Sequence, residues 1–229
     1  MTNWSSEEIA IVLLSLRVAL VGTIASLPVA IVTALVLARS RFWGRSILNA
    51  LVHLPLVLPP VVTGYLLLRA FGRRGPVGEF LESTLGLTFA FQWTGAALAA
   101  AVMGFPLMVR AIRIAIESID RRVEEASATL GASPVWTMVV ITVPMALPGV
   151  LSGMVLAFAK ALGEFGATIT FVSNIPGETQ TLALAIYSFI QSPGGDADAM
   201  RLVWLSLIVS FGALLASEAL ARRLDRSRQ

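Results

Sequence analysis

The sequence contains no cysteine, and it has one histidine (His53) and one lysine (Lys160) among its 229 residues. The missing cysteines exclude disulfides, a thiolate nucleophile and a cysteine-ligated metal, and a single histidine excludes a metal site built from several imidazoles. Charged residues make up only 14% of the chain, whereas a soluble domain carries about 25%. Hydrophobic residues make up 56%, and the mean hydropathy is +0.81. This balance excludes a free cytosolic enzyme, a secreted disulfide scaffold and a disordered tail, and it predicts an integral membrane protein.

Five apolar stretches are long enough to cross a bilayer, which takes about 20 residues in a helix. They lie at 9–38, 47–70, 89–108, 136–161 and 202–220. Helices are expected because backbone amides cannot stay unpaired in lipid. The sequence therefore predicts an all-α integral membrane protein with five transmembrane helices. We expect one transmembrane domain over 1–229, with its core at 9–221.

Basic residues divide unevenly between the connections. Segments 39–45 and 110–134 and the tail after 220 hold eleven arginines, whereas the three alternate segments hold two. The positive-inside rule then places the N-terminus outside and the C-terminus in the cytoplasm. We attribute the pI of 10.2 to the arginines that set this topology, and not to nucleic-acid binding. An odd number of spans without an internal repeat makes a parallel two-fold dimer, with a path along its axis, the simplest arrangement.

Three prolines interrupt the second span, at Pro55, Pro59 and Pro60. Each lacks an amide donor and clashes with the preceding turn, so this span cannot be a straight helix. Broken membrane helices are tolerated where neighbours or a water-lined cavity satisfy the freed carbonyls. The functional interpretation is a pore-lining or gating helix, and the alternative is a kink needed only for packing. His53 could relay protons, but a structural role is favoured because no carboxylate is near it in the sequence.

Ionisable and hydroxyl side chains within the spans are further candidates. Charged groups inside a membrane are functional candidates by default, although those near span ends can reach the interface. Lys160 and Glu164 are four residues apart and would pair on a continuing helix. The hydroxyls could line a path or bond helical carbonyls. The candidates for the pore or gate are Pro55, Pro59, Pro60, Thr63, Gly64, Lys160, Glu164, Thr168 and Thr170.

The cytoplasmic segment at 110–136 has a helical pattern. Apolar residues recur every three or four positions from Ile112 to Leu130, which predicts a helix with one apolar face. Gly131 fits a C-terminal cap, and Ser133 followed by Pro134 fits the start of a second helix. This helix either lies on its own bundle or inserts into a groove of a cytoplasmic partner. Periodicity alone leaves both interpretations open.

The same segment resembles the "EAA" motif of ABC importer permeases. The motif's residues are Glu125-Ala126-Ser127, then Gly131 six positions after the glutamate, then Ile141-Thr142-Val143-Pro144. Ser127 stands where the family has a third alanine, and Val143 where it has leucine. The resemblance implies that the segment couples the chain to an ATPase. The coupling residues so implied are Glu124, Glu125, Ala126, Ser127, Gly131, Ala132 and Pro144.

Four further segments resemble molybdate permease subunits, at 53–68, 73–75, 105–113 and 163–179. The resemblance extends over most of 4–221 and implies the type I ABC importer permease fold, working as a homodimer in the bacterial inner membrane. It also implies two cytoplasmic ATPase subunits, which bind ATP and Mg, and a molybdate-binding protein outside. No cofactor is implied on this chain itself.

The chain has no Gly-x4-Gly-Lys-Ser/Thr loop, so it is not expected to hydrolyse ATP. The implied activity is import of molybdate, with tungstate nearly indistinguishable from it in size and charge. A sulfate or thiosulfate permease of the same class is one alternative. A stand-alone anion channel or a secondary carrier is another, and the scarcity of acids within the spans argues against it. A membrane hydrolase is disfavoured because no Ser-His or His-Glu-x-x-His pattern is present.

Overall fold

The computed structural model describes residues 5–226, and within them it is helical without strands. This confirms the predicted all-α class. The helices are, in chain order, α1 (Ser6–Arg39), α2 (Arg45–Val57), α3 (Pro60–Phe71), α4 (Pro76–Leu85), α5 (Trp93–Glu117), α6 (Arg121–Thr129), α7 (Pro134–Thr137), the π-helical turn η1 (Met138–Thr142), α8 (Val143–Met145), α9 (Leu147–Leu162), α10 (Gly166–Val172), α11 (Leu182–Gln191) and α12 (Asp196–Arg226).

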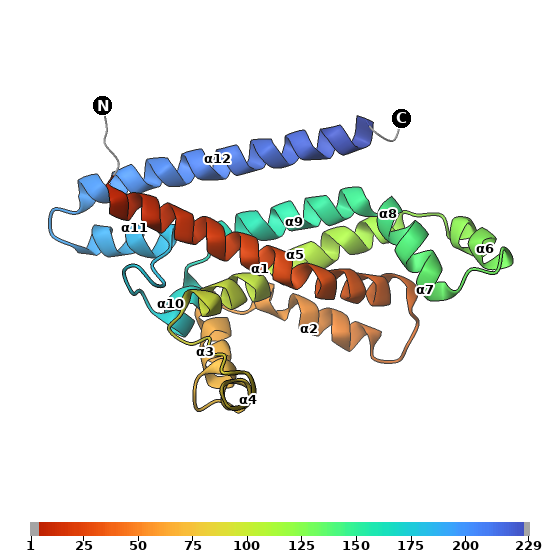
Figure 1. Ribbon diagram of the computed structural model, residues 1–229, viewed down its shortest axis with the longest axis horizontal. Coiled ribbons are helices and arrows are strands. Elements are labelled where there is room, and N and C mark those ends of the chain that lie inside the picture. The colour runs from red at the N-terminus through yellow and green to blue at the C-terminus, as the bar shows by residue number, and fades with distance from the viewer. Residues whose placement is uncertain (1–4, 227–229) are drawn as a thin grey trace.

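Three long helices, α1, α5 and α9, form the centre of the bundle (Figure 1). They approach closely because small residues line their contacts. A Cβ atom on Gly22 of α1 would lie 2.7 Å from the carbonyl oxygen of Ala97 on α5, and one on Gly104 of α5 would lie 3.1 Å from Ala157 on α9. The centre is therefore held by backbone-to-backbone packing more than by large side chains.

Two of the predicted spans are single helices and two are broken. Helices α1 and α5 are long and apolar enough to cross a membrane. The predicted second span is the pair α2 and α3, bent by 113°, and the predicted fourth span is the pair 134–145 and α9, bent by 68°. Among the described residues this gives two spans, or up to four if each bent pair counts as one. Helix α12 covers the fifth predicted stretch but is not among these, so the count of five stays a prediction.

The predicted helix from 110 to 130 is wrong as a single element. Helix α5 continues past the third predicted span to Glu117, and α6 begins only at Arg121. Asp120 starts α6, because its carboxylate accepts a hydrogen bond from the Arg122 amide at 3.0 Å and aspartate is a preferred N-cap. The apolar stripe is thereby divided: Ile112 and Ile116 are buried in the bundle, whereas Leu130 is 88% exposed.

The connections gather at two ends of the bundle (Figure 1). The α1–α2 connection, α6 and the end of α12 lie at one end, and the start of α1 lies with α10 and α11 at the other. These segments therefore lie with others predicted to share their side of the membrane, whereas α4, in the third segment predicted to lie outside, projects from the side of the bundle (Figure 1). Which end faces the cytoplasm stays a prediction.

Candidate functional site

The segment predicted to couple the chain to an ATPase contains residues 120–137, which we call the elbow, and is built from α6, a glycine turn and α7. Helix α6 ends in a Schellman motif, in which the Gly131 amide donates to the Ala128 carbonyl at 3.0 Å and the Ala132 amide to the Ser127 carbonyl at 3.1 Å. Gly131 has φ +86°, a conformation that glycine adopts without penalty. The predicted cap at Gly131 is therefore confirmed.

Helix α7 starts as the sequence indicated. The Ser133 hydroxyl accepts a hydrogen bond from the Trp136 amide at 3.3 Å, and Pro134 occupies the first turn, where its missing amide costs nothing. The two caps together fix a sharp bend between α6 and α7.

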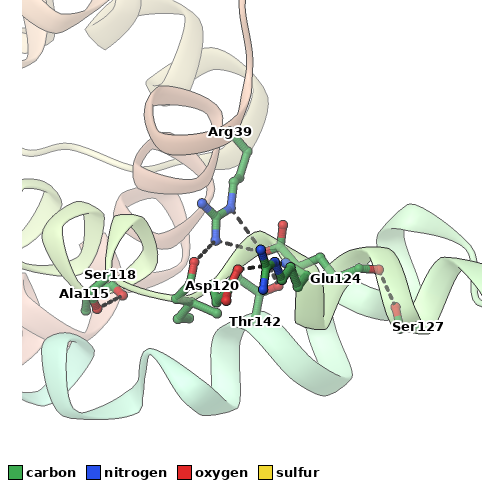
Figure 2. A network of polar contacts seen from close by, with 9 residues as sticks. Arg39, Ala115, Ser118, Asp120, Glu124, Ser127 and Thr142 are labelled. Atoms are coloured by element: carbon green, nitrogen blue, oxygen red, sulfur yellow. Dashed lines mark hydrogen bonds and ion pairs between the residues drawn. The ribbon is translucent and has the colours of Figure 1, made fainter.

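A polar junction anchors the elbow to the bundle (Figure 2). Arg39, the last residue of α1, donates from Nε to Glu124 Oε1 at 3.0 Å and from Nη2 to the Ile119 carbonyl at 3.2 Å. Thr142, in the π-helical turn, donates to the same Glu124 oxygen at 3.0 Å. The Arg39 and Glu124 side chains are 15% and 22% exposed, so solvent screens the pair only in part. Glu124 thus joins α1, α6 and η1 through one carboxylate.

A second contact closes the inner side of the elbow. The hydroxyls of Ser127 and Thr137 lie 2.6 Å apart, and both residues are buried. Alanine, which the family pattern has at this position, could not form this bond. The departure at Ser127 therefore adds a link between α6 and α7.

The outer side of the elbow exposes apolar side chains. Leu130, Val135 and Trp136 are 88%, 70% and 62% exposed, and Glu125 and Ala126 are also exposed. Leu130 and Trp136 line an open hollow of about 630 Å³, together with Gly131, Ala132 and Ile141. Pro144 is exposed in the short helix α8 beyond it. Apolar side chains at the end of a polar elbow are typical of a surface that binds a partner.

The second candidate region is the break between α2 and α3. Pro55 lies inside α2, Leu58 and Pro59 are extended, and Pro60 opens α3. Residues before a proline are driven out of the helical conformation, so the paired prolines end α2 and redirect the chain by 113°. The expected kink is therefore a complete break.

Helix α3 leaves this break packed tightly on α10. A Cβ atom on Gly64 would lie 2.5 Å from the Ala167 carbonyl oxygen and 2.9 Å from the Thr170 Cβ, and one on Gly166 would lie 2.7 Å from the Pro60 Cβ. Thr63 is buried, and its hydroxyl has no hydrogen-bond partner among residues 5–226. The structure thus brings the proline break and α10 together, although the two are about 100 residues apart in the sequence.

The predicted Lys160–Glu164 pair is present at the turn between α9 and α10. The Lys160 ammonium donates to Glu164 Oε2, and the Ala167 amide donates to Glu164 Oε1 at 2.9 Å. Glu164 is buried, whereas Lys160 is partly exposed. Thr168 is buried, and Thr170 donates to the Gly166 carbonyl at 2.9 Å. This pair fixes the start of α10, the helix that supports α3.

The two regions lie at opposite ends of the bundle, with α6 at one end and α10 at the other (Figure 1). The sequence did not indicate that Arg39 and Thr142 are the partners of Glu124, although Thr142 lies in the EAA-like motif. Arg39 was counted only as a topological charge, and it is 85 residues from Glu124, so no local pattern joins them.

Comparisons with known proteins agree with the geometry. A family model described as "Binding-protein-dependent transport system inner membrane component" matches residues 26–229. The chain is 54% identical over 219 residues to the molybdenum transport system permease protein ModB of Haemophilus influenzae, covering 96% of each chain. It is 56% identical over 211 residues to the protein of that name from Escherichia coli K12, covering 92% of each.

Among solved structures, the fold is similar to that of a chain in a bacterial alginate ABC transporter in complex with alginate pentasaccharide-bound periplasmic protein. The TM-score is 0.76 at 18% sequence identity, covering 96% of this chain and 80% of that chain. At this identity the likeness shows the fold, which is the ABC transporter fold that the motif resemblance implied.

Proposed function

The chain belongs to the family of binding-protein-dependent transport system inner membrane components, and on that premise we propose that it is the permease subunit of an ATP-driven importer of molybdate. The observation that carries this proposal is the high identity to two molybdenum transport permeases over nearly the whole chain. The same relationship makes the chain a multi-pass protein of the bacterial inner membrane. The relatives' names do not favour the sulfate or thiosulfate alternative.

The proposal includes an assembly. Two copies of this chain, each a single domain of five spans with the N-terminus outside, form a homodimer around an axial path. Two cytoplasmic ATPase subunits bind ATP and Mg and dock on the elbows, and a molybdate-binding protein docks outside. The exposed apolar side of each elbow supports the ATPase contact. The exposed apolar side chains of α2 and α3, such as Leu51, Val57 and Tyr65, suit a membrane or a second copy.

The proposed mechanism is alternating access. When ATP brings the ATPases together, the elbows move with them, and the Arg39–Glu124–Thr142 junction carries that movement into α1 and the α7–α9 segment. Helix α9 leads directly to the Lys160–Glu164 turn and α10, on which α3 and the proline break rest. The movement thus reaches Pro59 and Pro60 through packed elements. The path itself need not bind the anion tightly, because a deep well would slow release.

The test uses this chain purified with its candidate ATPase and solute-binding protein in lipid nanodiscs. ATP hydrolysis is measured with the binding protein loaded with molybdate, tungstate or sulfate. We expect stimulation by molybdate and tungstate and none by sulfate. Stimulation by sulfate would show that the chain is a permease of the same importer class with a different oxyanion as its substrate. Anion flux through this chain without any bound ATPase would overturn the importer and favour a channel or carrier.

A further inference from the structure

A polar furrow runs along the face of α2 that meets α5. Arg45, Asn49 and His53 are spaced four residues apart on α2, so they share one helical face. Across from them, α5 contributes Arg110, Arg113 and Glu117. These six residues define the α2–α5 furrow. Two neighbouring cavities of about 280 and 400 Å³ lie in it, and Asn49 and Arg113 line both.

Hydrogen bonds hold several of these side chains in place. Arg113 donates from Nη1 to Asn49 Oδ1 at 2.9 Å and from Nε to Glu117 Oε1 at 2.8 Å. His53 Nδ1 lies 2.8 Å from the Asn49 carbonyl oxygen. A carbonyl can only accept, so Nδ1 carries the hydrogen, and the bond fixes the orientation of the ring. The furrow is therefore preorganised before any ligand arrives.

The furrow has excess positive charge. Three guanidinium groups face one carboxylate, Glu117, whose oxygen lies 3.7 Å from Arg45 Nη2 and 2.8 Å from Arg113 Nε. Arg110 lines the 400 Å³ cavity and makes no hydrogen bond or ion pair within residues 5–226. Arg110 is exposed, and an arginine without a protein partner keeps its five N–H donors available for a ligand. A planar guanidinium matches the oxygen spacing of a tetrahedral oxyanion.

The position of the furrow indicates when it would be used. The furrow begins near the α1–α2 connection, at the same end as the elbow (Figure 1). The last of its residues on α2 is His53, two residues before Pro55. An anion that has passed the proline break would meet the furrow next. We propose that the α2–α5 furrow binds a tetrahedral oxyanion on the cytoplasmic side of the break, as a weak exit site. This inference rests on the proposed function for the direction of transport.

Two sources supply a tetrahedral oxyanion here, namely the transported anion and the phosphate of a lipid headgroup. The experiment separates them by preparing the permease–ATPase complex in nanodiscs of neutral phosphatidylcholine and in nanodiscs that include anionic phosphatidylglycerol. Binding of radiolabelled molybdate is measured by equilibrium dialysis without the solute-binding protein. Lipid retained after detergent exchange is measured by native mass spectrometry.

The key variant is Arg110→Gln, because this side chain has no structural partner to lose within the described residues. Arg110→Lys keeps the positive charge but removes the planar, forked set of N–H donors of the guanidinium group. The matched control is Arg41→Gln, an exposed arginine outside the furrow at the same end of the molecule. In phosphatidylcholine we expect weak molybdate binding that Arg110→Gln lowers by about tenfold, the loss typical of one charge-assisted hydrogen bond. Arg110→Lys should lose less, and Arg41→Gln should bind as the unmodified chain does.

Each outcome decides the proposal. Molybdate binding that depends on Arg110 supports the transported anion as the ligand. Retention of phosphatidylglycerol that depends on Arg110, without molybdate binding, supports a lipid headgroup. Equal behaviour of Arg110→Gln and Arg41→Gln in both measurements would overturn the site and leave these arginines with a topological role only. Basal ATP hydrolysis by each variant checks that the complex has assembled. Failure of the proposed function would appear separately, as no stimulation by loaded binding protein.

Discussion

At the scale of single residues, the junction of Arg39 and Glu124 makes a direct prediction. We expect Arg39→Gln to lower the stability of the complex by about 1–3 kcal/mol, because a hydrogen bond to a charged group contributes on that order. It should also reduce the stimulation of ATP hydrolysis by loaded binding protein more than it reduces basal hydrolysis, because the elbow stays docked but loses its hold on α1. Thermal unfolding and the ratio of stimulated to basal hydrolysis measure the two effects.

The control for this prediction is a double-mutant cycle. Its members are Arg39→Gln, Glu124→Gln and the double variant. The double variant should lose clearly less stability than the sum of the two single losses, because both substitutions break the Arg39–Glu124 bond, although each residue also has a partner of its own in the Ile119 carbonyl or Thr142. Arg41→Gln, an exposed arginine two residues away, serves as the matched charge change. Fully additive losses would show that Arg39 and Glu124 act independently, against the junction.

Gly131 makes a second prediction at this scale. A Cβ atom there would meet nothing within 4 Å, but φ is +86°, and a residue with a side chain pays roughly 1–2 kcal/mol in the left-handed region. Gly131→Val should therefore distort the turn and weaken co-purification of the ATPase, while the bundle stays folded. Gly131→Asn should retain most of the binding, because asparagine tolerates this conformation. If Gly131→Val co-purifies with the ATPase normally, the turn has no docking role.

The contrast between these two sites explains what the sequence could and could not predict. The caps at Gly131 and Ser133 depend on residues within five positions of each other, so the sequence indicated both of them. Arg39 and Glu124 are 85 residues apart in the sequence, and the positive-inside rule alone already accounts for an arginine at position 39. Local chemistry was therefore predictable at the elbow, whereas the anchor that connects the elbow to the bundle was not.

At the scale of helices, the close packing of α3 on α10 yields a third prediction. A Cβ atom on Gly64 would lie 2.5 Å from a backbone oxygen of α10, so Gly64→Ala must push the two helices apart. Overpacking of this kind typically costs about 1–3 kcal/mol. We expect a lower thermal midpoint and a loss of molybdate uptake in proteoliposomes.

Gly163→Ala is the matched control for this change. Gly163 lies in the same region, an added Cβ atom there would meet nothing within 4 Å, and its φ is an ordinary −94°. Its substitution should be neutral or stabilising by about 0.4–1 kcal/mol, since it restricts only the unfolded chain. Equal loss of uptake in both variants would show that the contact of Gly64 with α10 is not the cause.

The same elements show where sequence reasoning about helices fails. The prolines located the interruption of the second span to within a residue or two, but not its angle, because the 113° turn depends on packing against α10, about 100 residues later in the chain. The periodic stripe from Ile112 to Leu130 was real on both sides of Asp120, yet it serves two surfaces. Its first part is buried in the bundle and its last residue is exposed, and a stripe alone does not say what covers it.

At the scale of the whole molecule, the proposed sidedness and the proposed partner are linked. Charge asymmetry predicts that the elbow lies in the cytoplasm, and a partner there would cover the elbow's exposed apolar side chains. The absence of cysteine makes both statements testable in one experiment, because any introduced cysteine is the only thiol in the chain. Suitable exposed positions are Arg41 and Leu130 at one end and Glu178 at the other.

We expect a membrane-impermeant maleimide to label Glu178→Cys, but neither Arg41→Cys nor Leu130→Cys, in intact spheroplasts. Inverted vesicles should give the reverse pattern. In inverted vesicles with the ATPase bound, labelling of Leu130→Cys should fall strongly, because the proposed docking would cover a side chain that is 88% exposed in this chain alone, whereas labelling of Arg41→Cys should not change. Labelling of Arg41→Cys from outside would reverse the orientation. Unchanged labelling of Leu130→Cys on ATPase binding would show that the ATPase does not dock on this part of the elbow, without affecting the conclusion about topology.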